Sequence, residues 1–229
     1  MESMTEAEAL ARSIIRTAGE NQVPTHAILT SMDQVLGRTA GNALEVKETL
    51  DYLSGANRDP GLHEVVMALT SEMLILTNLA ADATEARAKL QNQLDNGRAM
   101  EIFGHMVASL GGPRDFVERP DHYLAKAPVV KAAYVGESGY ISRIDVRNVG
   151  NAVVRLGGGR SVPGQVLDMA VGFADMAGIG DYVDNTRPLA MVHARSEDDA
   201  GQVIADLQKC YHLSDKKPDT PAVIKKLMT

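Results

Sequence analysis

A run of three glycines and an arginine, residues 157–160, is the stretch whose residue types first suggest chemistry. A glycine-rich turn between a strand and the first turn of a helix can bind phosphate through its backbone N–H groups. The apolar residues 152–156 predict such a strand, and residues 166–176 predict the helix. However, no Lys-Ser or Lys-Thr follows the glycines, and their spacing matches neither a P-loop nor a dinucleotide-binding turn. We therefore favour a structural corner that needs positive φ angles over a phosphate site.

A second candidate site lies in the loop at residues 31–38 and on the helix expected at residues 43–53. Loops that follow strands of a parallel sheet are where α/β proteins bind ligands. The backbone carbonyls of Leu36 and Thr39, together with the carboxylate of Glu48, would present oxygen ligands to a hard monovalent cation. The alternative, that Glu48 is simply a carboxylate on a helix surface, stays open.

The remaining reactive residue types form no recognisable catalytic arrangement. The six histidines are scattered, and no HExxH or CxxC spacing occurs, which argues against a catalytic zinc site. His193 lies in a predicted strand, where a packed or edge histidine is more common than an acid–base group. Cys210, the single cysteine, excludes an intrachain disulfide and is expected to be a small helix residue rather than a nucleophile. We assign no catalytic residue, no substrate-binding residue and no organic cofactor.

Composition excludes several classes of function. The chain has 229 residues, of which 45% are apolar, so it can form one sizeable domain or two small ones. A net charge of −7 and an aromatic content of 4% argue against general nucleic-acid binding. The sequence shows no apolar run long enough to span a bilayer and no basic-then-apolar leader, so we expect no membrane partner and a cytoplasmic location.

The first half of the chain is expected to be mainly helical. One strand is predicted at residues 25–30, and helices are predicted at 5–18, 43–53, 60–79, from Asp82 onward, and at 99–110. A helix, a short loop and a strand make half of an α/β crossover unit, so the strand is expected to belong to a parallel sheet. Residues 114–128 contain two prolines and no clear periodicity, which indicates a surface linker.

The second half has the patterns of a β-rich module that ends in a helix. Strands are predicted at 129–135 and 140–145, around a turn, and a helix capped by Ser196 at 198–210. Residues 180–194 predict two strands joined by the turn at 184–186, as in biotinyl or lipoyl carrier modules. That turn contains no lysine to carry a cofactor, which argues strongly against a carrier function. The expected fold class is α/β overall, and α+β within this chain: a partial parallel-sheet domain (1–113), a linker (114–128) and a barrel-sandwich-like module (129–229).

Both halves resemble the thymidine and pyrimidine-nucleoside phosphorylase family, over nearly the whole chain. The shared runs in the first half are Met32-Asp33-Gln34, Leu36-Gly37 and Gly41-Asn42-Ala43-Leu44-Glu45-Val46-Lys47-Glu48. Those in the second half are Ala152-Val153-Val154, Gly157-Gly158-Gly159-Arg160, Val171-Gly172-Phe173, Asp175-Met176-Ala177, Gly180-Asp181, Val183-Asp184, Arg187-Pro188-Leu189-Ala190 and His193-Ala194. An ordered series of matches is far more specific than any single glycine motif.

The resemblance implies a pentosyltransferase of nucleoside salvage, which cleaves thymidine with phosphate to thymine and 2-deoxyribose 1-phosphate. It also implies a potassium ion at the residues matching Leu36, Thr39 and Glu48, and a homodimer in the family. The family's Lys-His-Ser-Thr-Gly-Gly phosphate run and its pyrimidine-binding residues do not occur here. We therefore expect a C-terminal fragment of a thymidine phosphorylase that is inactive alone. The alternatives are a fragment of a broader pyrimidine-nucleoside phosphorylase, or a non-catalytic structural or interaction module.

Overall fold

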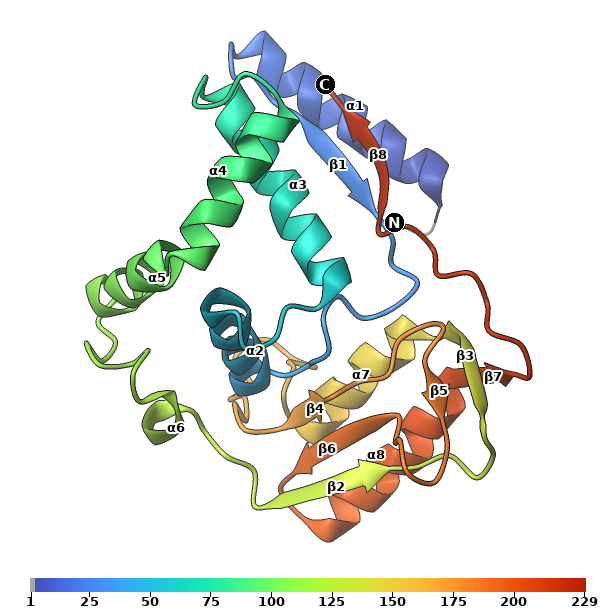
Figure 1. Cartoon of the computed structure of the whole chain (residues 1–229). Coiled ribbons are helices and arrows are strands. Elements are labelled where there is room, and N and C mark those ends of the chain that lie inside the picture. The colour runs from blue at the N-terminus through green and yellow to red at the C-terminus, as the bar shows by residue number, and fades with distance from the viewer. Residues whose placement is uncertain (1–2) are drawn as a thin grey trace. The chain divides into compact units, whose positions relative to one another are not determined.

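The computed structural model describes residues 3–229, which form eight helices and eight strands (Figure 1). The helices are α1 Met4–Glu20, α2 Asn42–Ser54, α3 Pro60–Leu76, α4 Ala83–Asp95, α5 Arg98–Ser109, α6 Pro120–Tyr123, α7 Val146–Leu156 and α8 Glu197–Cys210. The strands are β1 Ala27–Thr30, β2 Val129–Ala133, β3 Gly139–Ile144, β4 Gly172–Ala174, β5 Tyr182–Val183, β6 Ala190–Ala194, β7 Tyr211–Ser214 and β8 Ile224–Met228. None of these helices is long and apolar enough to cross a membrane.

The mixture of helices and small antiparallel sheets confirms the α+β class expected for this chain. The strands of residues 3–229 form one two-stranded and two three-stranded sheets, and no barrel. The chain divides into two compact units that interleave along the sequence. The first comprises residues up to Ser31, Pro60–Arg98 and Pro221–Thr229, and the second comprises Met32–Asp59 and Ala99–Thr220. The division into 1–113, 114–128 and 129–229 stays a prediction about domain limits.

The first unit pairs the beginning of the chain with its end. Strand β1 pairs antiparallel with β8, whereas we expected it in a parallel sheet; β8 is its partner within the described residues. Helix α1 begins with a capping box, in which the hydroxyl of Ser3 accepts from the Glu6 N–H and the Glu6 carboxylate accepts from the Ser3 N–H. Ser3 therefore caps the helix, which begins at Met4, one residue before the predicted range 5–18.

Helices α3 and α4 of the first unit begin where the sequence predicted. Pro60 occupies the first turn of α3, and the side chain of Asp82 accepts from the N–H of Glu85 to cap α4. The two helices pack together, and Arg87 forms a forked pair with Glu64 at 2.6 and 3.0 Å. In the same unit, the partly buried ring of His26 lies 2.6 Å from the carboxylate of Glu72. The first unit is therefore held by cross-element pairs as well as by apolar packing.

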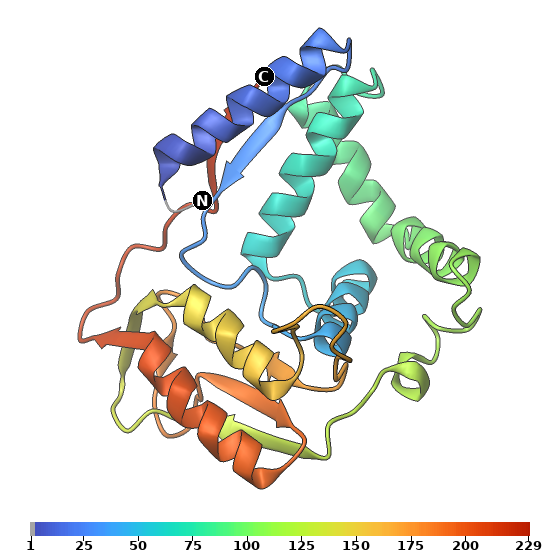
Figure 2. The same cartoon turned by 180° about the vertical axis from the view of Figure 1, so that it is seen from behind.

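The second unit contains two antiparallel sheets, ordered β2-β6-β4 and β5-β3-β7. Helices α7 and α8 pack against each other and lie on one face of the β2-β6-β4 sheet (Figures 1 and 2). Helix α2 contacts β4 at the edge of that sheet. The contact brings residues from the first sixty positions of the chain beside the C-terminal module.

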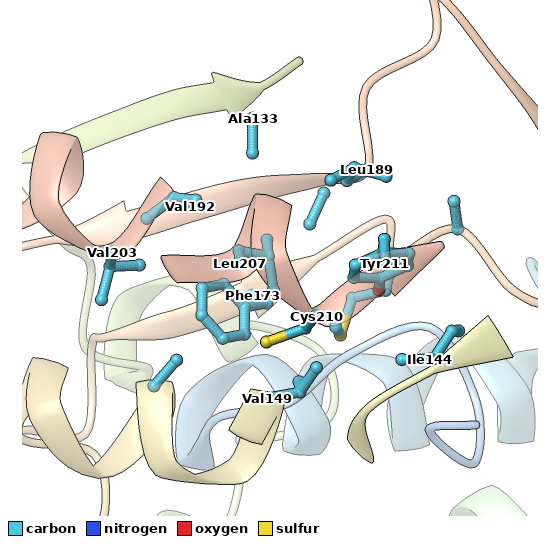
Figure 3. Close-up of a cluster of buried hydrophobic side chains, with 14 of the residues drawn as sticks. Ala133, Ile144, Val149, Phe173, Leu189, Val192, Val203, Leu207, Cys210 and Tyr211 are labelled. Atoms are coloured by element: carbon cyan, nitrogen blue, oxygen red, sulfur yellow. The ribbon is translucent and has the colours of Figure 1, made fainter. Parts of the chain in front are cut away.

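A dense apolar core holds the second unit together. Figure 3 shows the ring of Phe173 between Val149 of α7 and Leu207 of α8, with Val192 of β6 nearby. All of these side chains are buried, and Phe173 is completely inaccessible to solvent. Because apolar burial is the main stabilising contribution in small domains, strand β4, which carries Phe173, is firmly fixed.

Several local predictions for the second half were wrong. Residues 152–156 belong to helix α7, because Val149, Ala152, Val153 and Leu156 recur at helical spacing and Asp145 caps the helix. Residues 166–176 form no helix; they are a loop followed by β4. A short apolar run seen without its upstream periodicity cannot distinguish strand from helix.

The pairing of the predicted strands also differs from expectation. The segments at 129–135 and 140–145 are strands, as predicted, but β2 pairs with β6, and β3 pairs with β5 and β7. Strands β5 and β6 lie in different sheets, so residues 180–194 do not form a paired hairpin. The region 114–128 is not featureless, since it contains α6 and the buried Phe116, which packs on Phe103 and Tyr123. Pairing partners far along the chain leave no local signal in the sequence.

Candidate functional site

The carboxylate of Glu48 lies against the loop that precedes helix α2. Its Oε1 accepts from the backbone N–H of Arg38 at 2.6 Å, and its Oε2 accepts from the hydroxyl of Thr39 at 2.6 Å. Gly37 faces the same carboxylate, and a Cβ added there would lie 2.7 Å from each oxygen. Glu48 is thus turned inward to the loop, and is not a plain solvent-facing helix carboxylate.

Two of the three residues predicted to hold a cation are in contact. The hydroxyl of Thr39 donates to Glu48, whereas the ligand predicted from Thr39 is its backbone carbonyl. Leu36 lies in the same loop, and its side chain is half-exposed. A carboxylate offers about four lone-pair positions, so Glu48 can accept these two hydrogen bonds and still contact a cation. The donors are therefore of the right type for an oxygen-liganded ion such as potassium, and the site itself stays a prediction.

Arg38 fastens this loop to other parts of the second unit. Its Nε donates to Asp59 at 3.1 Å, and its Nη1 donates to Asp181 at 2.6 Å and to the carbonyl of Met176 at 3.2 Å. Burial works against the charged guanidinium, but the hydrogen bonds to Asp181 and Asp59 prevail and raise the pKa of Arg38. Arg38 is thus a permanently charged link between α2's loop and the β4–β5 region.

Main-chain hydrogen bonds reinforce the same contact. Ala40 and Phe173 exchange N–H···O=C bonds of 2.9 and 2.8 Å, and the N–H of Met176 donates to the carbonyl of Arg38 at 2.9 Å. The side chain of Gln34 accepts from the N–H of Ile179 at 2.8 Å. The loop therefore joins β4 as a short antiparallel extension, and its position depends on the C-terminal module.

The glycine corner at residues 157–160 is structural. It follows helix α7, and Gly157 is the left-handed C-cap with φ +98°. A helix C-terminus presents carbonyl oxygens and partial negative charge, which disfavours an anion. The carbonyl of Gly158 accepts from the side chain of Asn42 at 3.0 Å. The preference for a corner over a phosphate cradle is confirmed, whereas the strand-turn-helix context assumed for a cradle was wrong.

The other reactive side chains lie in structural positions. Cys210 is the last residue of α8, as predicted for a small helix residue; it is buried and donates to the carbonyl of Asp206, and burial raises its thiol pKa. His193 lies in β6 as predicted, and its pKa is lowered by burial, with Asp175 acting in the opposite direction. The hydroxyl of Tyr211 is buried and has no hydrogen-bond partner within the described residues. Within residues 3–229, none of these three side chains is hydrogen-bonded to Glu48 or Thr39.

Sequence reasoning missed Arg38, Asp59, Asp181 and Gln34 as members of the site. Each lies in a loop or at an element boundary, where polar residues are ordinary. Asp181 stood among the residues shared with the phosphorylase family, but nothing in its surroundings showed that it pairs with a side chain 143 positions away. Only the tertiary contact gives these residues a role.

Protonation of Asp181 at acid pH should lower the stability of the second unit. Partial burial works against its charged form, but the Gly178 N–H and the Arg38 guanidinium hold the pKa of Asp181 below its ordinary value. A carboxyl whose pKa is lower in the folded state than in the unfolded state stabilises the fold at pH values above its unfolded pKa of about 3.9. That stabilisation is lost as the pH falls through the folded-state pKa. Asp181→Asn should therefore cost about 1–2 kcal/mol at pH 7, and the difference from wild type should shrink below about pH 4.

Urea unfolding followed by tyrosine fluorescence measures this effect, because all six tyrosines lie in the second unit. The exposed Asp219 is a matched control, and Asp219→Asn should change the stability little at either pH. A difference between wild type and Asp181→Asn that grew toward acid pH would contradict the assignment.

Two protein-family models match the chain, one in each half. Residues 1–100 match the family model described as the glycosyl transferase family, a/b domain. Residues 140–214 match the pyrimidine nucleoside phosphorylase C-terminal domain. The first match defines the class, a pentosyltransferase-type protein. Taken with the second, it shows that the chain belongs to the thymidine and pyrimidine-nucleoside phosphorylase family.

Proposed function

We propose that the chain is the C-terminal part of a thymidine phosphorylase, with phosphate and thymidine as the substrates of the complete enzyme. The observation that carries this is the order of the two family matches, 1–100 and then 140–214. In support, the loop that carries Arg38 and Thr39 is hydrogen-bonded to residues of the matched C-terminal domain. A loop of the transferase part and the C-terminal domain thus form one interacting assembly.

In the proposed reaction a phosphate oxygen attacks C1′ of the deoxyribose while the bond from C1′ to N1 of thymine breaks. The electron pair leaves with the base, which takes up a proton, and the sugar becomes 2-deoxyribose 1-phosphate. Catalysis of such a step depends on positioning and on compensating the charge of phosphate and leaving base. Leu36, Thr39 and Glu48 would hold a potassium ion, which when bound supplies positive charge and ties oxygen-lined loops together.

The role proposed for this chain is support of the site rather than the chemical step. Glu48 fixes the loop through the Arg38 N–H and the Thr39 hydroxyl, and the C-terminal domain fixes Arg38. The phosphate run and the pyrimidine-gripping residues of the family are absent from the 229-residue sequence. We therefore propose that this chain alone does not cleave thymidine, that the complete enzyme is a homodimer, and that it acts in the cytoplasm.

A chromatographic assay for thymine tests the proposal. The purified 229-residue chain, with thymidine, phosphate and potassium, should release no thymine above a blank without protein. Clear turnover would contradict the inactivity of the chain alone.

The upstream reading frame tests the assignment to a larger enzyme: an in-frame phosphate run just before Met1 supports it, and a genuine promoter and start site at Met1 supports an independent module. Where such a run exists, assays of the longer product with thymidine and uridine decide between the thymidine-specific and the broader activity.

A further inference from the structure

Arg38 uses its main chain and its side chain for different partners. Its backbone N–H donates to Glu48, while its carbonyl accepts from Met176. Its guanidinium reaches Asp59 and Asp181. One residue therefore connects the carboxylate of the predicted cation site directly to the turn between β4 and β5.

The guanidinium pairs lie in partly buried surroundings. The side chains of Arg38, Asp59 and Asp181 are 34%, 13% and 32% exposed. Ion pairs of this kind are screened less than surface pairs, and the planar guanidinium can serve two carboxylates at fixed angles. Both carboxylates share the one guanidinium, so the loss of Arg38 would remove a partner from Asp59 and from Asp181 at once.

Asp181 is itself held in a defined orientation. Its Oδ2 accepts from the backbone N–H of Gly178 at 2.9 Å as well as from Arg38. The neighbouring Ile179 N–H is held by Gln34 from the loop. The turn at 178–181 and the loop at 34–41 are therefore tied by polar contacts from both sides.

We propose that Arg38 is a positioning residue, which couples the Glu48 carboxylate to Asp181 so that the predicted cation loop is ordered only while the 172–181 segment is docked. The cation readout of this inference rests on the proposed function, but the coupling itself does not. Asp181 lies 133 positions from Glu48 in the sequence. The C-terminal domain would thereby control a site to which it contributes no ligand.

Hydrogen exchange measured by mass spectrometry tests the coupling without a cation. Asp181→Asn keeps the shape of the side chain and removes its charge, and Arg38→Lys keeps the charge and removes the fork. For Asp181→Asn we expect exchange at least about tenfold faster in peptides covering residues 34–41, which contain the Arg38 and Ala40 amides, and a smaller increase for Arg38→Lys. Arg155→Ala, which breaks the exposed pair with Asp206, is the control and should leave these peptides unchanged.

Potassium binding gives the second readout. Thermal unfolding followed by tyrosine fluorescence is compared in potassium chloride and choline chloride at equal ionic strength. Bound potassium should raise the unfolding temperature, and the potassium concentration that gives half of this rise should be the same in wild type and in Arg155→Ala. Asp181→Asn should need about tenfold more potassium for half of the rise, and in Glu48→Gln potassium should no longer raise the unfolding temperature.

The two readouts separate the two hypotheses. Unchanged exchange at 34–41 in Asp181→Asn overturns the coupling, whatever potassium does. Faster exchange supports the coupling even where wild type shows no potassium effect, and that result would count against the cation part of the proposed function alone. An unchanged potassium midpoint in Asp181→Asn, with the effect lost in Glu48→Gln, also overturns the coupling.

Discussion

Replacing Gly172 by alanine should destabilise the second unit by about 3–5 kcal/mol. Gly172 has φ +148°, and its backbone lies close to that of Gly41, whose φ is +147°. A Cβ at Gly172 would lie 2.2 Å from the carbonyl oxygen of Ala40 and 2.8 Å from the Cα of Gly41. Because both obstacles are backbone atoms, the loop would have to separate from β4, which would break the hydrogen bonds between Ala40 and Phe173.

Urea unfolding followed by tyrosine fluorescence measures the loss. The matched control is Gly150→Ala in helix α7, where an added Cβ meets nothing within 4 Å and φ is not positive. That substitution should stabilise the protein by up to about 1 kcal/mol, because alanine favours a helix interior. Equal stabilities of Gly172→Ala and wild type would show that the loop is not packed on β4 as described.

Replacing Phe173 by alanine is the second change with a large expected effect, a loss of about 3–5 kcal/mol of unfolding free energy. The ring is completely buried between Val149 and Leu207, so its removal leaves a cavity bounded by α7 and α8 (Figure 3). The cost combines the lost burial of the ring with the lost contacts of the atoms around it. Since the backbone of Phe173 pairs with Ala40, the loop of the candidate site should loosen as well.

The same unfolding measurement, with hydrogen exchange at residues 34–41, checks this expectation. Tyr134→Ala removes an aromatic ring that is 42% exposed, and it should cost less than about 1 kcal/mol. A loss for Phe173→Ala no larger than that for Tyr134→Ala would mean that the ring is not a core residue.

The sequence predicted most helices correctly, mainly in the first half of the chain, but it did not predict how the strands pair. Helices α1, α2, α3, α4, α5 and α8 occur close to the predicted ranges, because their apolar residues recur at helical spacing over three or more turns and most begin at a recognisable capping or proline residue. The prediction of a strand at 152–156 was wrong because these five residues contain only the end of the periodic pattern of α7. The pairings of β1 with β8 and of β2 with β6 were missed, because each joins residues distant in sequence.

In the candidate site, too, local features were predicted and contacts between distant residues were not. Leu36, Thr39 and Glu48 were named from the sequence and from a family resemblance, and the contact of Thr39 with Glu48 follows from local geometry, a loop that leads directly into a helix. Arg38 and Asp181 were not assigned to the site, because their pairing depends on how residues 172–181 fold back on the loop.

The amino-acid sequence by itself therefore determined the family, the mainly helical first half and the residue types at the predicted cation loop. The tertiary structure alone decided that Glu48 turns inward, that the glycine corner ends a helix, and that Arg38 joins the loop to the C-terminal domain. The physical reason is that helix periodicity and capping act over a few residues and are visible in the local sequence. Ion pairs and strand pairings join residues more than a hundred positions apart and exist only once the chain has folded.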